Sequence, residues 1–343
     1  MSFQSGTATG PTDLLQQLVT WLEGIGWNLD RSQTDGGMGG WRAHLDLDGV
    51  FVNLRAKQTT GSDPIFAGEA DAGGYCIALY LGTGHDGSFA WNAQAGAPLD
   101  GTTSAVIGAS MWLTAGPYTN YYFFADASGA NVTVVVEKTP GVYGHMGWGN
   151  LVKNGAWTGG AFFFGTLAGY FAGYRSFAPN TPGATATAFC PMCHSDDGNN
   201  SQSAAFVRVD VDSFTGKWVG ISMGAYGAGG WTGKLGASSV CGSTAQPTGI
   251  APYTNTAFNP ASNPQPFQYS QTSEADGRAN LLPILLWVQR DGAVDGNHAY
   301  SPIGAPPGLF FTNGVGNGFA GAEDYPLGGD TYTMFPNFAV KKV

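Results

Sequence analysis

The feature that most constrains the fold is residues 41–56, where apolar and polar residues alternate on both sides of Asp48-Gly49. Asp-Gly is favoured in two-residue hairpin turns because both central residues take a positive φ. The register set by this turn gives four apolar cross-strand pairs: Leu47 with Val50, Leu45 with Val52, Ala43 with Leu54, and Trp41 with Ala56. The opposite face carries polar side chains and one exception: Arg42, His44, Asp46, Asn53, Arg55 and Phe51. Turn chemistry and pattern together predict an antiparallel hairpin with one buried face.

One helix is expected, over residues 12–23. Its apolar stripe at helical spacing consists of Leu14, Leu15, Leu18, Leu22 and Ile25. Thr12 is expected to cap the first amides and Asp13 to suit the positive N-terminal end, while Gly24 and Gly26 end the helix. We expect the stripe to pack on the rest of the chain.

The remaining segments indicate strands joined by glycine-rich turns. The predicted strands are 75–81, the pair 121–124 and 132–136, the pair 206–211 and 217–219, and the late segments 281–289 and 330–340. Residues 178–203 and 255–273 have the composition of long surface loops. The predicted fold is mostly β (a β-rich α+β fold), with a short N-terminal amphipathic helix and a large antiparallel β body with long Gly/Pro-rich loops. We assign residues 1–30 to an N-terminal arm and helix and 31–343 to the body; two subdomains dividing near 180–205 are the alternative.

The composition indicates a surface that is partly covered by other molecules. Charged residues make up 11% of the chain and hydrophobic residues 43%, whereas a typical soluble domain has about 25% charged residues. Such chains usually bury part of their surface against neighbours. A secreted β-protein with many tight turns is the alternative.

The charge balance and hydropathy exclude several partner classes. The net charge of −10 argues against nucleic acid as a partner, because phosphates are bound through Lys and Arg. The sequence contains no polybasic segment for a membrane surface and no apolar run of about 20 residues that would span a bilayer. The N-terminus lacks the basic and apolar regions of a secretory signal. We expect a soluble protein made in the cytosol, or one whose signal was removed.

A search for catalytic motifs predicts that the chain is not an enzyme. The sequence has no phosphate-binding Gly-x-x-x-x-Gly-Lys-Ser/Thr loop, no Gly-x-Ser-x-Gly elbow and no His-Glu-x-x-His pair. None of the five histidines (His44, His85, His145, His194 and His298) has an obvious catalytic partner nearby in the sequence.

A cysteine pair forms the one candidate metal site. Cys190 and Cys193 have the Cys-x-x-Cys spacing of half a tetrahedral zinc site, and His194 and Cys241 could complete it. The alternatives are unligated thiols, a structural zinc or iron–sulfur cluster, or a disulfide, so no metal ligands are assigned. In each case the role would be to hold a loop. Cys76 is expected to be buried in a strand.

An aromatic and glycine-rich stretch, residues 141–165, has two interpretations. Tyr143, Trp148 and Trp157 could offer ring faces to a sugar. The favoured alternative is that small residues let aromatic side chains from adjacent backbones interlock in a core or an interface.

Blocks spread in order over nearly the whole chain carry a resemblance. They are SFQSGTAT (2–9), GWRAHL (40–45), GVFVNLR (49–55), PGVYGH (140–145), GNLVK (149–153), WTGG (157–160), RANLLP (278–283), YSPIG (300–304), PGL (307–309), LGGD (327–330) and MFP (334–336). Together with the helix over 14–22 they resemble a group of tailed-bacteriophage virion proteins. The loop with Cys190 and His194 is not part of the pattern.

The resemblance implies a virion protein that is assembled in the host cytoplasm and has no catalytic residues. Its implied partners are other virion or tail proteins and copies of itself, without nucleic acid or membrane insertion. We expect a structural tail or baseplate subunit. The alternatives are a tail-tip protein that binds a receptor or cell-surface glycan, a capsid decoration protein, and a depolymerase of cell-surface polymer.

Overall fold

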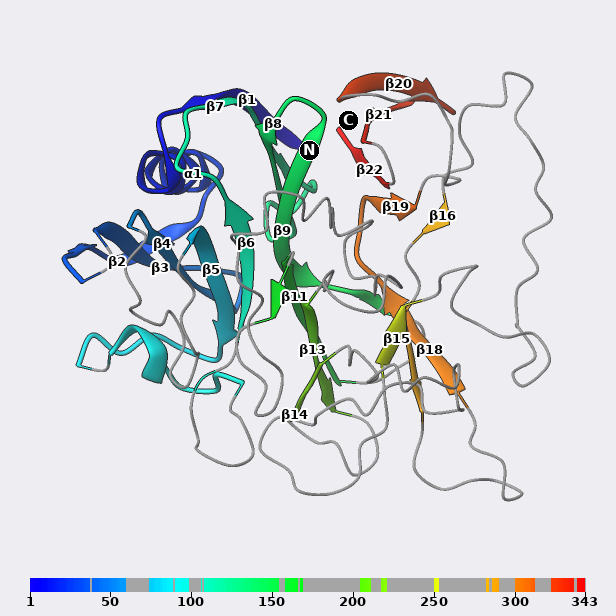
Figure 1. Ribbon diagram of the computed structural model, residues 1–343. Coiled ribbons are helices and arrows are strands. Elements are labelled where there is room, and N and C mark those ends of the chain that lie inside the picture. Colours follow the sequence, from blue (N-terminus) through cyan, green and yellow to red (C-terminus); the bar gives the residue numbers. More distant parts are fainter. Residues whose placement is uncertain are drawn as a thin grey trace, which may run out of the picture.

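The computed structural model describes residues 1–37, 39–59, 74–88, 90–98, 106, 108–153, 158–165, 167–168, 204–210, 217–220, 250–252, 282–283, 286–289, 300–311, 322–335 and 338–342. These residues form antiparallel sheets and one α-helix, which confirms the predicted mostly β fold (Figure 1). The proposed division near 180–205 falls largely outside them, so the domain boundaries stay a prediction.

The first sheet has the strand order β12-β6-β5-β4-β3-β2. Its strands are β2 (Asn28–Asp35), β3 (Gly40–Leu47), β4 (Val50–Lys57), β5 (Tyr75–Gly82), β6 (Ala109–Leu113) and β12 (Leu167–Ala168). We call it the six-stranded sheet. The predicted hairpin is β3–β4, and the predicted strand 75–81 is β5. Asp48 and Gly49 have φ values of 50° and 78°, as the turn requires.

The predicted register of this hairpin is confirmed along most of its length. Leu47 lies opposite Val50, Leu45 opposite Val52 and Ala43 opposite Leu54. The ladder between the described residues ends where Arg42 lies opposite Arg55, so it does not include the fourth predicted pair. Alternation and turn type were therefore sufficient to set both the register and the buried face.

The central sheet has the order β1-β7-β8-β9-β11-β13-β14. Its strands are β1 (Ser2–Ala8), β7 (Tyr118–Ala125), β8 (Val132–Thr139), β9 (Val142–Asn150), β11 (Thr158–Gly165), β13 (Ala204–Asp210) and β14 (Lys217–Gly220). The hairpins predicted over 121–136 and 206–219 are β7–β8 and β13–β14. The arm expected before the helix is instead an outer strand, β1, paired with β7.

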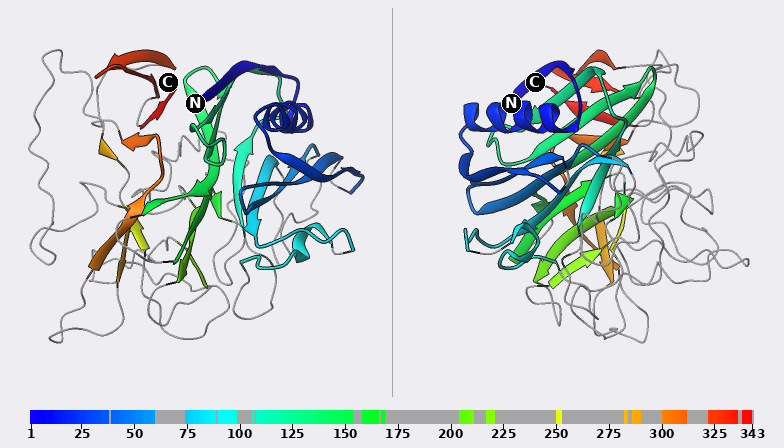
Figure 2. Two further views of the ribbon diagram at one scale, coloured as in Figure 1. Left: turned by 180° about the vertical axis from the view of Figure 1, so that it is seen from behind. Right: turned by 60° about the vertical axis from the view of Figure 1, so that its left-hand side comes forward.

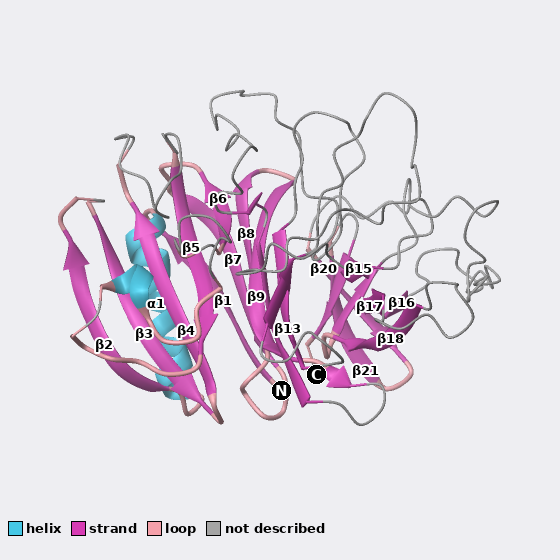
Figure 3. Cartoon of the chain, turned by 90° about the horizontal axis from the view of Figure 1, so that it is seen from below, coloured by secondary structure: helices cyan, strands magenta, loops and turns pink. Residues whose placement is uncertain are grey.

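The helix α1 (Pro11–Gly24) lies between these two sheets, beside β1 and β7 (Figures 1 and 3). Four of the five stripe residues are buried as predicted, and Ile25, just past the helix end, is half-buried. The Trp21 ring lies 5.5 Å from that of Phe123 on β7. The predicted cap is wrong: Gly10 is the N-cap residue, and no side chain makes a cap hydrogen bond. Pro11 occupies the first turn because its missing N–H costs nothing there, which moves the helix start ahead of Thr12.

The other face of the central sheet is covered by a C-terminal sheet of order β16-β19-β22-β21-β20 (Figures 1 and 2). Its strands are β16 (Leu282–Pro283), β19 (Leu309–Phe311), β20 (Glu323–Leu327), β21 (Asp330–Met334) and β22 (Phe338–Lys341). The segments expected as single late strands are each divided in two, into β16 and β17 (Leu286–Gln289) and into β21 and β22. Phe335 bridges the layers, with its ring 5.6 Å from Tyr122 and 5.3 Å from Tyr143.

A fourth, smaller sheet has the order β10-β18-β17-β15. Its strands are β10 (Val152–Lys153), β15 (Ile250–Pro252), β17 (Leu286–Gln289) and β18 (Tyr300–Ala305), and a 3-10 helix, η1, spans Trp91–Ala93. The expected loops 178–203 and 255–273 lie outside the described residues.

The aromatic stretch forms core, as the favoured interpretation predicted. Trp148 is 0% exposed and Tyr143 5%, so neither offers a ring face to a sugar; Trp157 lies outside the described residues. Gly147 explains how the rings fit together. A Cβ there would lie 2.5 Å from the Val132 carbonyl oxygen and 2.6 Å from Cζ of Phe164. The Phe164 ring therefore occupies the space above a glycine in the neighbouring strand.

Gly147→Ala should destabilise the protein by roughly 1–3 kcal/mol, because the added methyl group collides with a backbone oxygen that cannot move away. Chemical denaturation would measure the change in the free energy of unfolding. Gly24→Ala is the matched control: nothing lies within 4 Å of its Cβ position, and alanine at a helix end should change stability by less than about 1 kcal/mol. Equal effects of the two substitutions would contradict the interlocked packing.

Candidate interaction surface

A groove runs between β1 and α1. It has a volume of about 520 Å³ and is lined by Gln4, Gln16, Gln17, Thr20, Trp21, Gly24 and Ile25. It forms because β1 leads directly into the helix, which places the Gln16 and Thr20 side of α1 beside the strand. None of the lining side chains is charged, so the groove suits a neutral partner with hydrogen-bonding groups.

A chain of hydrogen bonds fixes the amides of this groove. Gln4 Nε2 donates to the Tyr121 hydroxyl over 3.0 Å, and that hydroxyl donates to Gln17 Oε1 over 2.7 Å. Gln17 Nε2 in turn donates to the Thr7 carbonyl oxygen, 3.0 Å away. Tyr121 reaches across because Gly6 has no side chain: a Cβ there would lie 2.7 Å from the hydroxyl. The groove is thus pre-organised by contacts between β1, β7 and α1.

Asp13 anchors the junction between strand and helix. Its Oδ2 accepts hydrogen bonds from the Thr9 N–H over 2.7 Å and the Thr9 hydroxyl over 3.0 Å, and its Oδ1 accepts one from Gln17 over 3.1 Å. Burial alone would raise the pKa of Asp13, but these hydrogen bonds bring it below its usual value. Asp13 lies in the first turn of α1, as predicted, and its bonds to Thr9 hold the residues that precede the helix.

The polar face of β2–β4 brings together two histidines that the sequence did not connect. The His44 and His85 rings lie 4.3 Å apart, and His44 Nδ1 is hydrogen-bonded to Asn53 Oδ1 over 2.5 Å. Burial, helped by the neighbouring His85, Arg42 and Arg31, lowers the pKa of His44 to about 4, although the hydrogen bond to Asn53 raises it. His44 is therefore neutral at pH 7.

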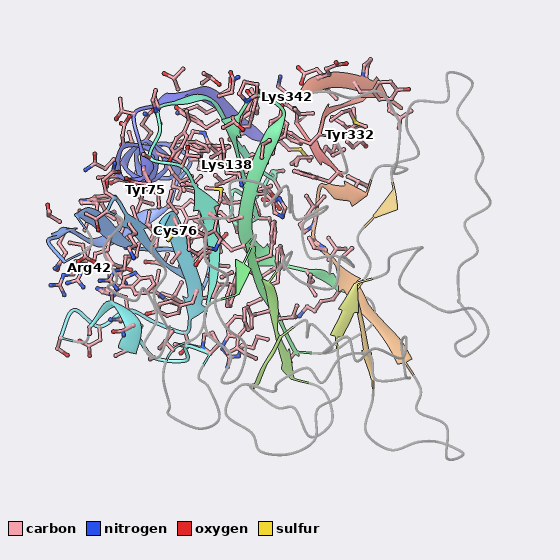
Figure 4. The ribbon with its side chains drawn as sticks, viewed as in Figure 1. Arg42, Tyr75, Cys76, Lys138, Tyr332 and Lys342 are labelled. Atoms are coloured by element: carbon pink, nitrogen blue, oxygen red, sulfur yellow. The ribbon has the colours of Figure 1, made fainter. Side chains whose placement is uncertain are left out.

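The arginines of the same face hold a covering segment in place. Arg31 Nη1 donates to the Gly87 carbonyl oxygen over 2.6 Å. Arg55 forms an ion pair of 2.6 Å with Asp35 and lies 5.4 Å from the Trp91 ring centre. Arg42 lies on the side of the sheet away from the central sheet, and burial lowers its pKa (Figure 4). Residues 83–88 and 90–98 thus pack over this face, which is why His44 and Asn53 are buried although their pattern predicted a solvent-facing side.

His145 is fully buried between the central and C-terminal sheets. Its ring lies 5.3 Å from Phe338, and neither ring nitrogen has a hydrogen-bond partner among the described residues. Burial lowers its pKa to about 3, and the charge of Lys138 adds to the effect. Burial likewise lowers the pKa of Lys138.

The predicted metal site lies outside the described residues: Cys190, Cys193, His194 and Cys241 all fall there. Within the described part of the chain no group of three or more His, Cys, Asp or Glu residues could hold a metal ion. The zinc, iron–sulfur and disulfide alternatives therefore stay predictions. Cys76 is buried in β5, as expected. No described helix has the length and apolar character needed to cross a bilayer.

Neither a scan against protein-family models nor a search of curated proteins finds a match to this chain. Its function is therefore inferred from the sequence blocks and from the geometry of these surfaces.

Acid should destabilise the fold through the two buried histidines. Their folded-state pKa values, about 4 for His44 and about 3 for His145, lie below the unfolded value of about 6.5. The unfolded chain therefore binds more protons, and stability falls as the pH drops from about 6.5 through these values. Thermal unfolding between pH 8 and pH 3 would measure the loss.

His145→Leu separates the loss of stability caused by the buried histidines from other effects of acid on the protein. The variant should be more stable than wild type by roughly 1–2 kcal/mol at pH 7, because it removes an unpaired buried polar ring, and its acid loss should be smaller. His44→Leu is the control: it should also reduce the acid loss but destabilise at pH 7, because Asn53 loses its partner. Destabilisation by His145→Leu at pH 7 would contradict the absence of hydrogen-bond partners for the His145 ring among the described residues.

Proposed function

We propose that this chain is a structural component of a tailed-phage particle, specifically a tail or baseplate subunit that acts through protein–protein assembly. The observation that carries the proposal is the ordered set of blocks between residues 2 and 336 that resembles tailed-phage virion proteins. The partners are other virion proteins and copies of the same chain.

The position of the blocks in the fold supports an assembly role. Block 2–9 forms β1 and leads into α1, while blocks 40–45 and 49–55 form β3 and β4. Block 140–145 covers the turn between β8 and β9. The resemblance therefore falls on residues that build the sheets and their edges. A chain with only 11% charged residues is also suited to burying surface against neighbours.

Labelling of assembled particles would test the proposal. A short epitope inserted between Gly328 and Gly329 should be tolerated, because both residues lie in an exposed turn with nothing within 4 Å of their Cβ positions. Electron microscopy with an antibody should then locate the label on the tail or baseplate. Removing the gene should give defective or tail-less particles. A label on the head would assign the chain to capsid decoration, and intact infectious particles without the protein would refute the structural role.

The groove favours glycan binding as a second candidate function, that of a receptor-binding tail-tip protein. Three glutamines, Thr20 and Trp21 are among the residues that line the groove. Neutral amides and hydroxyls match the hydroxyl groups of a sugar. This placement differs from the one expected from sequence, since Tyr143 and Trp148 are buried.

Glycan-array binding by the purified protein would test this second candidate. Gln16→Ala with Thr20→Ala should weaken glycan binding about tenfold or more, equivalent to ~1.4 kcal/mol or more, and leave stability unchanged because both side chains are exposed. Thr34→Ala, an exposed threonine on β2, is the control and should bind like wild type. A wild-type protein that retains no glycan would remove this candidate.

A further inference from the structure

Three terminal strands of five residues or more leave one edge unpaired among the described residues: β1 in the central sheet, β2 in the six-stranded sheet and β20 in the C-terminal sheet. An unpaired edge presents backbone N–H and C=O groups to which another strand can pair. Proteins that must avoid such pairing protect the edge with charges, prolines or bulges.

Two of these edges carry such protection. β2 contains Asp30 and Arg31, and its pairing with β3 is irregular between Leu29 and Arg31. β20 contains Glu323 and Asp324, and also Pro326, which has no N–H to donate. Both strands therefore resist the addition of a further strand.

The β1 edge carries neither a charge nor a proline, and its one irregularity of register lies at its end, between Gly6 and Ala8. Its sequence is SFQSGTA, and its register with β7 is regular from Ser2 to Gly6. Only its last part is engaged by the helix, because Gln17 donates to the Thr7 carbonyl oxygen. The stretch from Ser2 to Gly6 is therefore open, and the groove lined by Gln4 adjoins it and leaves room for the side chains of an added strand.

Charge and symmetry indicate a second copy as the occupant. Each copy has a net charge of −10, so copies repel one another, and the repulsion is weakest where the surfaces that meet are uncharged. Two identical strands that pair antiparallel can be related by a twofold axis. Both copies then use the same surface, so the assembly through this edge ends at two copies. If the open stretch from Ser2 to Gly6 pairs, Gln4 lies opposite its own copy and Ser5 lies opposite Phe3, so the two copies of Ser5 lie diagonally across the axis on the same face.

We propose that two copies of this chain associate by pairing their β1 strands antiparallel, which joins the two central sheets into one continuous sheet. This inference rests on the assembly role proposed above. It identifies one partner, a second copy of the chain, and the strand edge through which the two copies meet. The uncharged stretch from Ser2 to Gly6 is the interface; backbone hydrogen bonds hold the two strands together, and contacts between their side chains set the register.

Charge substitutions at Ser5, an exposed residue in the middle of β1, test the pairing. In sedimentation equilibrium of the purified full chain, wild type should be a dimer. Ser5→Glu and Ser5→Lys should each weaken the dimer about tenfold or more, because like charges then lie diagonally across the axis, about 7–8 Å apart. An equimolar mixture of the two variants should form a dimer again, which damage to the fold could not produce.

Ser32→Glu, which places the same charge on an exposed serine of β2, is the matched control and should leave the dimer intact. A wild type that stays monomeric, or Ser5 variants that dimerise like wild type, would overturn the inference. So would single variants that dissociate without recovery in the mixture. The mass in solution does not depend on where the protein lies in a particle, so failure of the labelling experiment and failure of this one are distinguishable.

Discussion

The central sheet has two apolar faces, and the rest of the structure depends on the need to cover both. One face carries Phe123, Val134 and Trp148, which are fully buried against the six-stranded sheet and α1. The other carries Tyr122, Phe124 and Tyr143, which pack around Phe335 from the C-terminal sheet. A sheet buried on both faces needs a layer on each side. The ends of the chain meet as a result: the Lys342 ammonium lies 4.2 Å from the Phe3 ring centre, and Figures 2 and 4 show the C-terminus beside β1.

Local patterns predicted those parts of the fold in which the neighbour of a strand is the next strand in sequence. The β3–β4 hairpin followed from alternation and the Asp48-Gly49 turn, and β7–β8 from two apolar runs around a glycine turn. β1 was missed because Ser, Gln, Gly and Thr give it no apolar alternation, and its partner β7 begins only at Tyr118. The cap at Thr12 was wrong because Pro11 starts the helix one residue earlier.

The surfaces were harder to predict than the strands because each is assembled from distant segments. His44 was placed on a polar face, but residues 83–88 and 90–98 cover that face and bring His85 against it. Likewise, the groove requires Tyr121 to reach beneath Gly6 to Gln17, a contact that joins residues 104 positions apart. No spacing in the sequence signals either arrangement. The only available signals were the glycine itself and the unusual run of uncharged polar residues before the helix.

Those same uncharged residues connect folding with assembly. A strand that carried lysine or glutamate would protect its edge, yet β1 also has to lie beside α1 with its amides turned into the groove, where a buried charge would be costly. Gln4 and Gln17 meet that requirement because amides can bond to the Tyr121 hydroxyl and the Thr7 carbonyl without carrying charge. The requirement for uncharged side chains where β1 packs beside α1 therefore also leaves the outer edge of β1 neutral. In a chain with a net charge of −10, a neutral edge is the place where another molecule can approach at the lowest electrostatic cost.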